Sequence, residues 1–244
     1  MMHSENEIIH CIAQIMPLEP QLFLDYDGTL VPIIKHPEIN QVDSELLKLI
    51  ATLNSRLETY IVTGREVKDI IKFLGDYNII GLHGSVFHIG GETIAIPKFN
   101  MYTDLFKRIY TENLYLEKRF PGLKMYNKTG GVMFHLGNIR SPQYFYVIHK
   151  IANFLACRYK LDLYCGINIM ELRIPHVNKG NAIRSIRNRN RPAIIIGDDN
   201  TDEDSFIANP DAITIKVGEE ETHARFSIYY ESVRPLLWKL IKIL

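Results

Sequence analysis

The chain has 244 residues, which is enough for one large domain or for a domain that carries a substantial insertion. Hydrophobic residues make up 46% of it and charged residues 23%, globular proportions that exclude a disordered tail or a small disulfide scaffold. The 28 Lys and Arg residues balance the 28 Asp and Glu residues, so no excess positive charge is available to bind nucleic acid.

The sequence shows no membrane span, secretory signal or cysteine framework. No apolar run reaches the roughly 18 to 20 residues of a membrane span. Residues 1–21 contain Glu5, Glu7 and Glu19 and no basic segment of the kind that begins a secretory signal. The three cysteines are scattered, without metal-binding spacing, which is typical of reduced thiols. We therefore expect a cytoplasmic protein with no membrane or nucleic-acid partner, and the sequence is compatible with a monomer.

The first part of the chain alternates between short apolar runs and amphipathic stretches. Residues 22–24 and 60–62 are apolar runs that end at polar residues, which is typical of buried strands. Between them, Asp43 or Ser44 can cap a helix whose leucines and isoleucines repeat at spacings of three and four. The segments predicted to follow are a helix over 66–74, which Gly75 can end, and a strand over 79–82.

After Pro97 the pattern changes to paired strands and longer helices. The predicted elements are a helix over 103–120, a hairpin of 123–126 and 132–136, a helix over 141–155 and paired strands over 161–165 and 167–174. The flanking segments alternate strands with helices, which indicates a parallel sheet. We therefore predict an α/β fold, a Rossmann-like parallel-sheet core of residues 1–97 and 175–244 with an inserted α+β cap at 98–174.

The core is predicted to resume after the insertion. A helix follows Lys179, and the apolar run over 193–196 predicts a buried strand. Thr201 is placed at the start of the next helix, with Asp204 at capping-box spacing. A strand over 212–217 completes the predicted core.

The strongest chemical signal is DYDGTL at 25–30, in which two carboxylates, Asp25 and Asp27, follow a buried strand. Side chains at that position stand at the carboxyl edge of an open sheet, where α/β proteins bind ligands. One carboxylate can attack an electrophile while the other transfers protons, provided that a cation keeps the first one ionised. A polar turn after a strand is the alternative explanation of this motif.

Two further segments supply groups that suit a phosphate. Thr63, Gly64 and Arg65 follow the second strand and open a helix, so the hydroxyl and nearby amides can donate to phosphate oxygens. Lys179 stands at the start of a helix, where its ammonium can neutralise phosphoryl charge. Taken alone, the first segment could be an ordinary helix cap and Lys179 an exposed lysine.

An acidic cluster at 197–204 (GDDNTDED) follows the apolar strand. So many carboxylates are costly unless a cation sits among them, and hard oxygen ligands suit Mg²⁺. A solvated acidic helix start explains Glu203 and Asp204 better than it explains Asp198.

These four elements, in this order, resemble the haloacid dehalogenase superfamily of phosphatases. Within that superfamily, the segments LFLDYDGTL, IVTGR, GLHGS, ELRIPHVNKGNAI, GDDNTDEDSF and VGEEETHA are similar to those of the trehalose-6-phosphate phosphatases. The similarity covers most of the core and both edges of the predicted cap. It implies Mg²⁺-dependent hydrolysis of trehalose 6-phosphate through an aspartyl-phosphate.

The resemblance also implies roles for individual residues. Asp25 would be the nucleophile, and Asp27 would protonate the leaving sugar oxygen and then deprotonate the hydrolytic water. Thr63 and Lys179 would hold the phosphoryl group.

The same resemblance implies a magnesium site. Asp25, the backbone carbonyl of Asp27 and Asp198 would be the ligands of Mg²⁺, with Asp199 or Asp202 in support. Phosphate monoesters hydrolyse very slowly without a catalyst, so charge neutralisation by the metal and Lys179 is the chemistry that such a site needs.

Some positions in the predicted core and cap depart from the family. Family members commonly carry Glu or Asn at the position of Leu82, and a His-Tyr-Arg-like run where this chain has His-Leu-Gly at 135–137. The missing arginine would usually contact the substrate from the cap. Lys128 and Glu171 are the remaining candidates for sugar contacts in the cap.

Three other functions remain open from the sequence. The chain could hydrolyse another sugar phosphate, for example of the sucrose or mannosylglycerate type, or it could be a sugar phosphomutase with the same nucleophile. It could also be a silent binding protein that senses a phosphosugar, although neither the nucleophile nor the metal carboxylates are lost.

Overall fold

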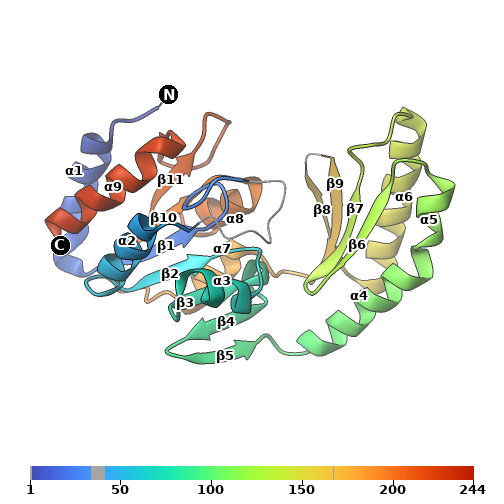
Figure 1. The fold of residues 1–244 in the computed structure, drawn as a ribbon, viewed down its shortest axis with the longest axis horizontal. Helices are drawn as coiled ribbons and strands as arrows, with labels where there is room; N and C mark the ends of the chain where they lie inside the picture. The colour runs from blue at the N-terminus through green and yellow to red at the C-terminus, as the bar shows by residue number, and fades with distance from the viewer. Residues whose placement is uncertain (1, 34–41, 167) are drawn as a thin grey trace. The chain divides into compact units, whose positions relative to one another are not determined.

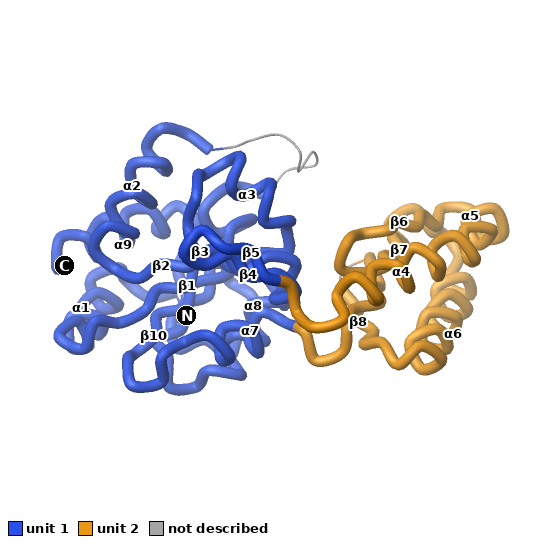
Figure 2. The backbone as a smooth tube through the Cα atoms, turned by 90° about the horizontal axis from the view of Figure 1, so that it is seen from below, with its two compact units in different colours: residues 1–94, 178–244 blue, residues 95–177 orange. Residues whose placement is uncertain are grey.

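The structure is a computed structural model that describes residues 2–33, 42–166 and 168–244. The chain divides into two compact units, shown in Figure 2: unit 1 is residues 1–94 with 178–244, and unit 2 is residues 95–177. The insertion expected at 98–174 lies within unit 2. None of the helices within the described ranges is long and apolar enough to cross a membrane.

Unit 1 is built on an eight-stranded sheet of order β12-β11-β10-β1-β2-β3-β4-β5 (Figure 1). Its strands are β1 (Gln21–Asp25), β2 (Thr59–Val62), β3 (Asn78–Gly81), β4 (Val86–Ile89), β5 (Glu92–Ala95), β10 (Ala193–Gly197), β11 (Ile213–Val217) and β12 (Phe226–Ile228). All pairings from β12 to β3 are parallel, and β4 is antiparallel to β3. The predicted α/β class with a parallel sheet is confirmed.

Helices cover both faces of this sheet. They are α1 (Glu5–Ile15), α2 (Ser44–Asn54), α3 (Val67–Leu74), α7 (Lys179–Ile186), α8 (Asn200–Ala208) and α9 (Tyr230–Ile243). In β1, Leu22 and Leu24 belong to the core formed with α1, α2, α3 and α9, whereas Phe23 packs in the core with α7 and α8. Because successive strand residues point to opposite faces, a sheet buried on both sides requires continuous apolar strands.

The ends of two helices follow the predicted chemistry. Asp43 is the N-cap of α2, and its side chain accepts a hydrogen bond from the Leu46 amide at 2.7 Å. Gly75 ends α3 with a φ of 110°, a conformation that favours glycine. Both caps were expected from the sequence and are confirmed.

Unit 2 contains a four-stranded sheet of order β6-β7-β9-β8, with every pairing antiparallel. Its elements are α4 (Phe99–Asn113), α5 (Tyr115–Arg119), β6 (Lys124–Lys128), β7 (Gly131–His135), α6 (Pro142–Tyr159), β8 (Asp162–Gly166) and β9 (Ile169–Arg173). Side chains of α4 and α6, among them Phe106 and Ile148, share one core with Val132 and Leu172 of the sheet. The single helix expected over 103–120 is two helices, because α4 ends at Asn113.

Several elements of unit 1 were not expected. They are the hairpin of β4 and β5, strand β12, helices α1 and α9, and the short 3-10 helices η1 (Met16–Leu18) and η2 (Leu82–Gly84). The strand expected to reach Leu82 ends at Gly81, because Leu82 and His83 adopt positive φ angles of 49° and 55°.

Candidate active site

The predicted catalytic residues lie where neighbouring parallel strands end. Asp25 is the last residue of β1, Thr63 directly follows β2, and Asp198 directly follows β10. Strands β10, β1 and β2 are adjacent and parallel, so their carboxyl ends share one edge of the sheet. This edge is the place at which open α/β sheets bind ligands.

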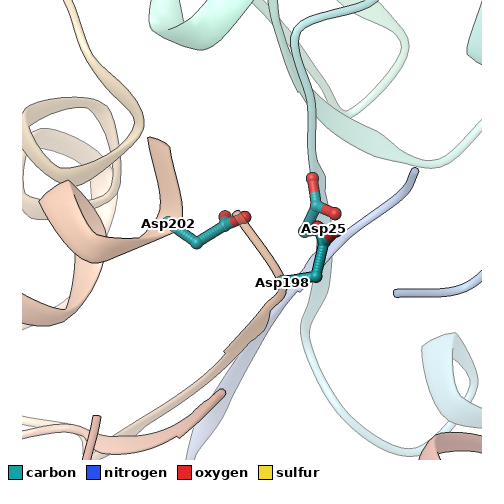
Figure 3. Close-up of side chains that lie close together, drawn as sticks. All are labelled: Asp25, Asp198 and Asp202. Atoms are coloured by element: carbon teal, nitrogen blue, oxygen red, sulfur yellow. The ribbon is translucent and has the colours of Figure 1, made fainter. Parts of the chain in front are cut away.

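Three carboxylates converge at this edge (Figure 3). Each of Asp25, Asp198 and Asp202 offers an oxygen within 4.8 Å of the oxygens offered by the other two. Asp25 and Asp202 are almost fully buried, with 4% and 2% of their surface exposed. Like charges this close cannot all remain ionised without a compensating cation.

Lys179 supplies one positive charge to the cluster. It is the first residue of α7, and its ammonium donates to Oδ1 of Asp25 at 2.6 Å and to Oδ1 of Asp202 at 2.9 Å. Lys179 is itself 2% exposed, so the interaction is screened little by water. This burial contradicts the alternative that Lys179 is an exposed lysine.

One ammonium cannot balance the charge of three carboxylates, and burial disfavours their ionised forms further. Burial raises the pKa of Asp25 to about 7, against the opposing charge of Lys179. Burial and the charges of Asp199 and Asp202 raise the pKa of Asp198 to about 7. Burial alone would lower the pKa of Lys179, but Asp202 and Asp25 outweigh it and raise that pKa well above its ordinary value.

The donor set fits a hard divalent cation. Oδ2 of Asp25 and Oδ1 of Asp198 are buried and have no hydrogen-bond partner among the described residues. Gly28, with a φ of 84°, makes room for Asp198, because a Cβ at this position would lie 1.9 Å from Oδ2 of that aspartate. Buried carboxylate oxygens without donors are costly unless a cation or a proton meets them.

Asp199 caps a helix rather than joining the cluster of three. Its side chain accepts hydrogen bonds from the amides of Thr201 and Asp202, and the Asp202 side chain accepts one from the Asp199 amide. The expected cap at Thr201 with Asp204 is therefore wrong. Helix α8 begins earlier because this reciprocal capping box satisfies its first amides.

The loop after β2 holds Thr63, Gly64 and Arg65, the three residues expected near the phosphate. Thr63 is 1% exposed, and its hydroxyl accepts a hydrogen bond from the Arg65 amide at 3.1 Å. Gly64 permits a close approach of His83, since a Cβ on Gly64 would lie 2.5 Å from Nε2 of that ring.

Asp27 lies outside the carboxylate cluster and is paired with Arg65. Nε of Arg65 donates to Oδ2 of Asp27 at 2.7 Å, and Nη2 donates to Oδ1 at 2.5 Å. Arg65 was expected among the substrate-binding residues, and its guanidinium is engaged by the carboxylate of Asp27, the expected acid-base group.

In unit 2, the two expected sugar contacts lie together on the sheet. The ammonium of Lys128 is 3.4 Å from Oε1 of Glu171, which is 3% exposed. Arg173, which the sequence analysis missed, donates to Oε2 of Glu171 from Nε at 2.8 Å and stacks over the ring of Tyr164. Glu171, Arg173 and Tyr164 share the face opposite the helices, because alternate residues such as Leu172 belong to the helix-side core.

A second missed residue, Lys216, supports the position of Asp198. It is a buried lysine in β11, and its ammonium donates to the backbone carbonyl of Asp198. A single charged residue within the strand ITIKV at 213–217 was the available signal, because a buried ammonium needs an oxygen partner.

Comparison with known proteins agrees with the geometry. The model of the family described as trehalose-phosphatase matches residues 23–226. A trehalose-6-phosphate phosphatase-related protein of Thermoplasma acidophilum is 46% identical over 228 residues, which are 91% of this chain and 97% of that protein. A solved structure of a trehalose-6-phosphate phosphatase related protein matches with a TM-score of 0.78 and 44% identity, covering 91% of this chain and 97% of that one.

A bifunctional trehalose-6-phosphate synthase/phosphatase of Thermoproteus tenax is 31% identical over 236 residues. The match covers 90% of this chain but only 31% of that longer relative.

Proposed function

The chain belongs to the trehalose-phosphatase family, and we propose that it hydrolyses trehalose 6-phosphate to trehalose and inorganic phosphate. The observation that carries the proposal is the buried contact of Lys179 with Asp25 and Asp202 at the sheet edge. A carboxylate nucleophile beside a fixed ammonium is the arrangement needed to accept a phosphoryl group.

We propose that Asp25 is the nucleophile. One of its carboxylate oxygens attacks phosphorus, and the bond between phosphorus and the sugar oxygen breaks. Asp27 gives its proton to that sugar oxygen, so that trehalose leaves as a neutral alcohol. A water molecule then attacks the aspartyl-phosphate, Asp27 takes a proton from it, and the bond between phosphorus and Asp25 breaks.

Thr63 and Lys179 hold the phosphoryl group in this proposal. The Lys179 ammonium is fixed by its two carboxylate contacts, and Thr63 lies at the end of the neighbouring strand. A fixed donor stabilises charge in the transition state without having to reorient.

We propose that the metal of this site is Mg²⁺. Asp25, Asp198 and the backbone carbonyl of Asp27 would hold it, with Asp202 or Asp199 in support. When bound, the cation supplies the charge neutralisation that lets one anionic carboxylate meet a phosphate dianion.

Discrimination among sugars is assigned to unit 2. Glu171 is buried between Lys128 and Arg173, so its orientation is fixed before a ligand binds. A buried charged acceptor of this kind binds a ligand that completes its hydrogen bonds more tightly than a ligand that leaves them unmade. We propose that Glu171 and Lys128 contact sugar hydroxyls.

The comparisons do not favour the alternative substrates, since the matching family is described as trehalose-phosphatase. A silent phosphosugar sensor would not need a nucleophile, and here Asp25 is present and held by Lys179. A phosphomutase would isomerise its substrate rather than release phosphate.

The proposed function is tested by phosphate release from a panel of sugar phosphates with Mg²⁺ present. We expect kcat/KM for trehalose 6-phosphate to exceed the values for sucrose 6-phosphate, mannosylglycerate phosphate and glucose 6-phosphate. A higher kcat/KM for another sugar phosphate would identify that compound as the preferred substrate. Isomerised sugar phosphate without phosphate release would indicate a mutase.

A further inference from the structure

The side chain of Arg65 is paired with a carboxylate of the same unit. Its Nε and Nη2 bind the two carboxylate oxygens of Asp27 at 2.7 and 2.5 Å. Such a paired, planar contact fixes the orientation of a carboxylate more strictly than one hydrogen bond does.

Two aromatic rings hold the guanidinium in place. The Cζ atom of Arg65 lies 5.3 Å from the ring centre of Tyr26 and 5.7 Å from that of Phe73. Both rings are buried, at 1% and 8% exposure, and stack with an interplanar angle of 15°. Cations over aromatic faces are stabilised, more so where water is excluded.

The backbone of Arg65 is also fixed. Its amide donates to the Thr63 hydroxyl at 3.1 Å, and its carbonyl accepts a hydrogen bond from the Leu82 amide at 2.9 Å. Arg65 is therefore tied to the loop after β2, while Asp27 follows β1. The contact links the ends of two adjacent strands.

We propose that Arg65 is a positioning residue for the acid-base carboxylate of Asp27, and not a phosphate ligand. The inference rests on the proposed function, because it takes Asp27 as the group that protonates the leaving oxygen. With both oxygens of Asp27 bound by Arg65, the side chain cannot point elsewhere without breaking two charge-assisted hydrogen bonds. The guanidinium therefore restricts where Asp27 can deliver its proton.

Two aryl esters separate this role from phosphate binding. A p-nitrophenolate ion leaves without a proton, whereas phenolate and sugar alkoxides are stronger bases that need one. The ratio kcat/KM includes only the steps up to release of the alcohol, so it isolates proton donation from the later attack of water. Neither ester carries a sugar, so recognition by unit 2 does not enter.

The test variant is Arg65→Met, whose long apolar side chain can still pack on Tyr26 and Phe73. We expect kcat/KM for phenyl phosphate to fall at least about tenfold more than kcat/KM for p-nitrophenyl phosphate. Arg65→Lys, which can bind one carboxylate oxygen, should lie between Arg65→Met and the wild type. In an Asp27→Asn background, Arg65→Met should leave the ratio of the two kcat/KM values unchanged, within about twofold.

Arg191→Ala is a matched control, because it removes an arginine paired with Glu58 at the amino ends of strands in the same sheet. The ratio of its kcat/KM for phenyl phosphate to its kcat/KM for p-nitrophenyl phosphate should equal the ratio of the wild type. Equal losses on both esters in Arg65→Met, or a changed ratio in the Asp27→Asn background, would overturn the inference. If Arg65→Met does not fold, as judged by circular dichroism, Arg65→Lys carries the same comparison. Failure of the wild type to hydrolyse trehalose 6-phosphate would refute the proposed function but leave this aryl-ester test intact.

Discussion

The ammonium of Lys179 lies 2.6 Å from Oδ1 of Asp25, although 154 residues separate them in the chain. The contact joins the first turn of α7 to the end of β1, and both side chains are buried. The same ammonium also contacts Asp202, so one positive charge serves two carboxylates. The remaining negative charge must be met by protons or by a metal ion.

Chelation should stop catalysis. Within the described residues, buried oxygens of Asp25 and Asp198 lack hydrogen-bond donors, and an uncompensated carboxylate would repel a phosphate dianion. We expect excess EDTA to abolish phosphate release and Mg²⁺ to restore it, whereas sodium chloride of equal ionic strength should not. Full activity in excess EDTA would count decisively against the metal assignment.

The metal-free protein should lose stability as the pH rises from about 4 to about 7. The folded-state pKa values of Asp25 and Asp198 are raised from 3.8 to about 7, so in this range the folded protein binds more protons than the unfolded chain. The stability that these protonated carboxyl groups contribute is therefore fully present below pH 3.8, the pKa in the unfolded chain. It is lost as the pH approaches about 7, the pKa in the folded protein.

Urea unfolding with EDTA at pH 5 and pH 7 measures this fall. Asp198→Asn cannot take up the proton, so its free energy of unfolding should fall less than that of the wild type. Mg²⁺ should stabilise the protein more at pH 7 than at pH 5, because it competes with protons for the same oxygens. If the free energy of unfolding falls equally in Asp198→Asn and in the wild type, Asp198 does not take up the proton.

Changes at Glu171 should alter sugar choice more than chemistry. We expect Glu171→Ala to lower kcat/KM for trehalose 6-phosphate by roughly tenfold or more, and Lys128→Ala to act in the same direction. Hydrolysis of p-nitrophenyl phosphate should be nearly unchanged in both, because that ester has no sugar hydroxyls.

Glu112→Ala provides the matched control in unit 2, since Glu112 is exposed on α4, on the other side of that unit's sheet. It should behave as the wild type on both substrates. If Glu171→Ala lowers turnover of both substrates equally, Glu171 supports the fold or the site and does not recognise the sugar.

The sequence predicted the parallel core and the sheet edge at which the carboxylates meet, because short apolar runs ending in Asp25, Thr63 and Asp198 carry strong local signals. It left open whether Asp199 or Asp202 joins Asp25 and Asp198. Asp202 joins the cluster only because α8 begins at Asn200, where the capping box of Asp199 sets the register of the helix.

Other features depend on contacts between distant segments. The pairing of Arg65 with Asp27 joins two loops, and the burial of Lys216 depends on the carbonyl of Asp198. The hairpin of β4 and β5 was missed because β5 is exposed throughout, so no apolar pattern marks it.

Asp25→Asn tests whether Asp25 is the nucleophile in the hydrolysis of trehalose 6-phosphate. The amide keeps the shape of the side chain but removes the attacking charge. The measurement is phosphate release from trehalose 6-phosphate, with Mg²⁺, by wild-type and variant protein whose circular dichroism spectra match. We expect rapid release by the wild type and none above background by Asp25→Asn, whereas near wild-type release by the variant would show that Asp25 is not the nucleophile.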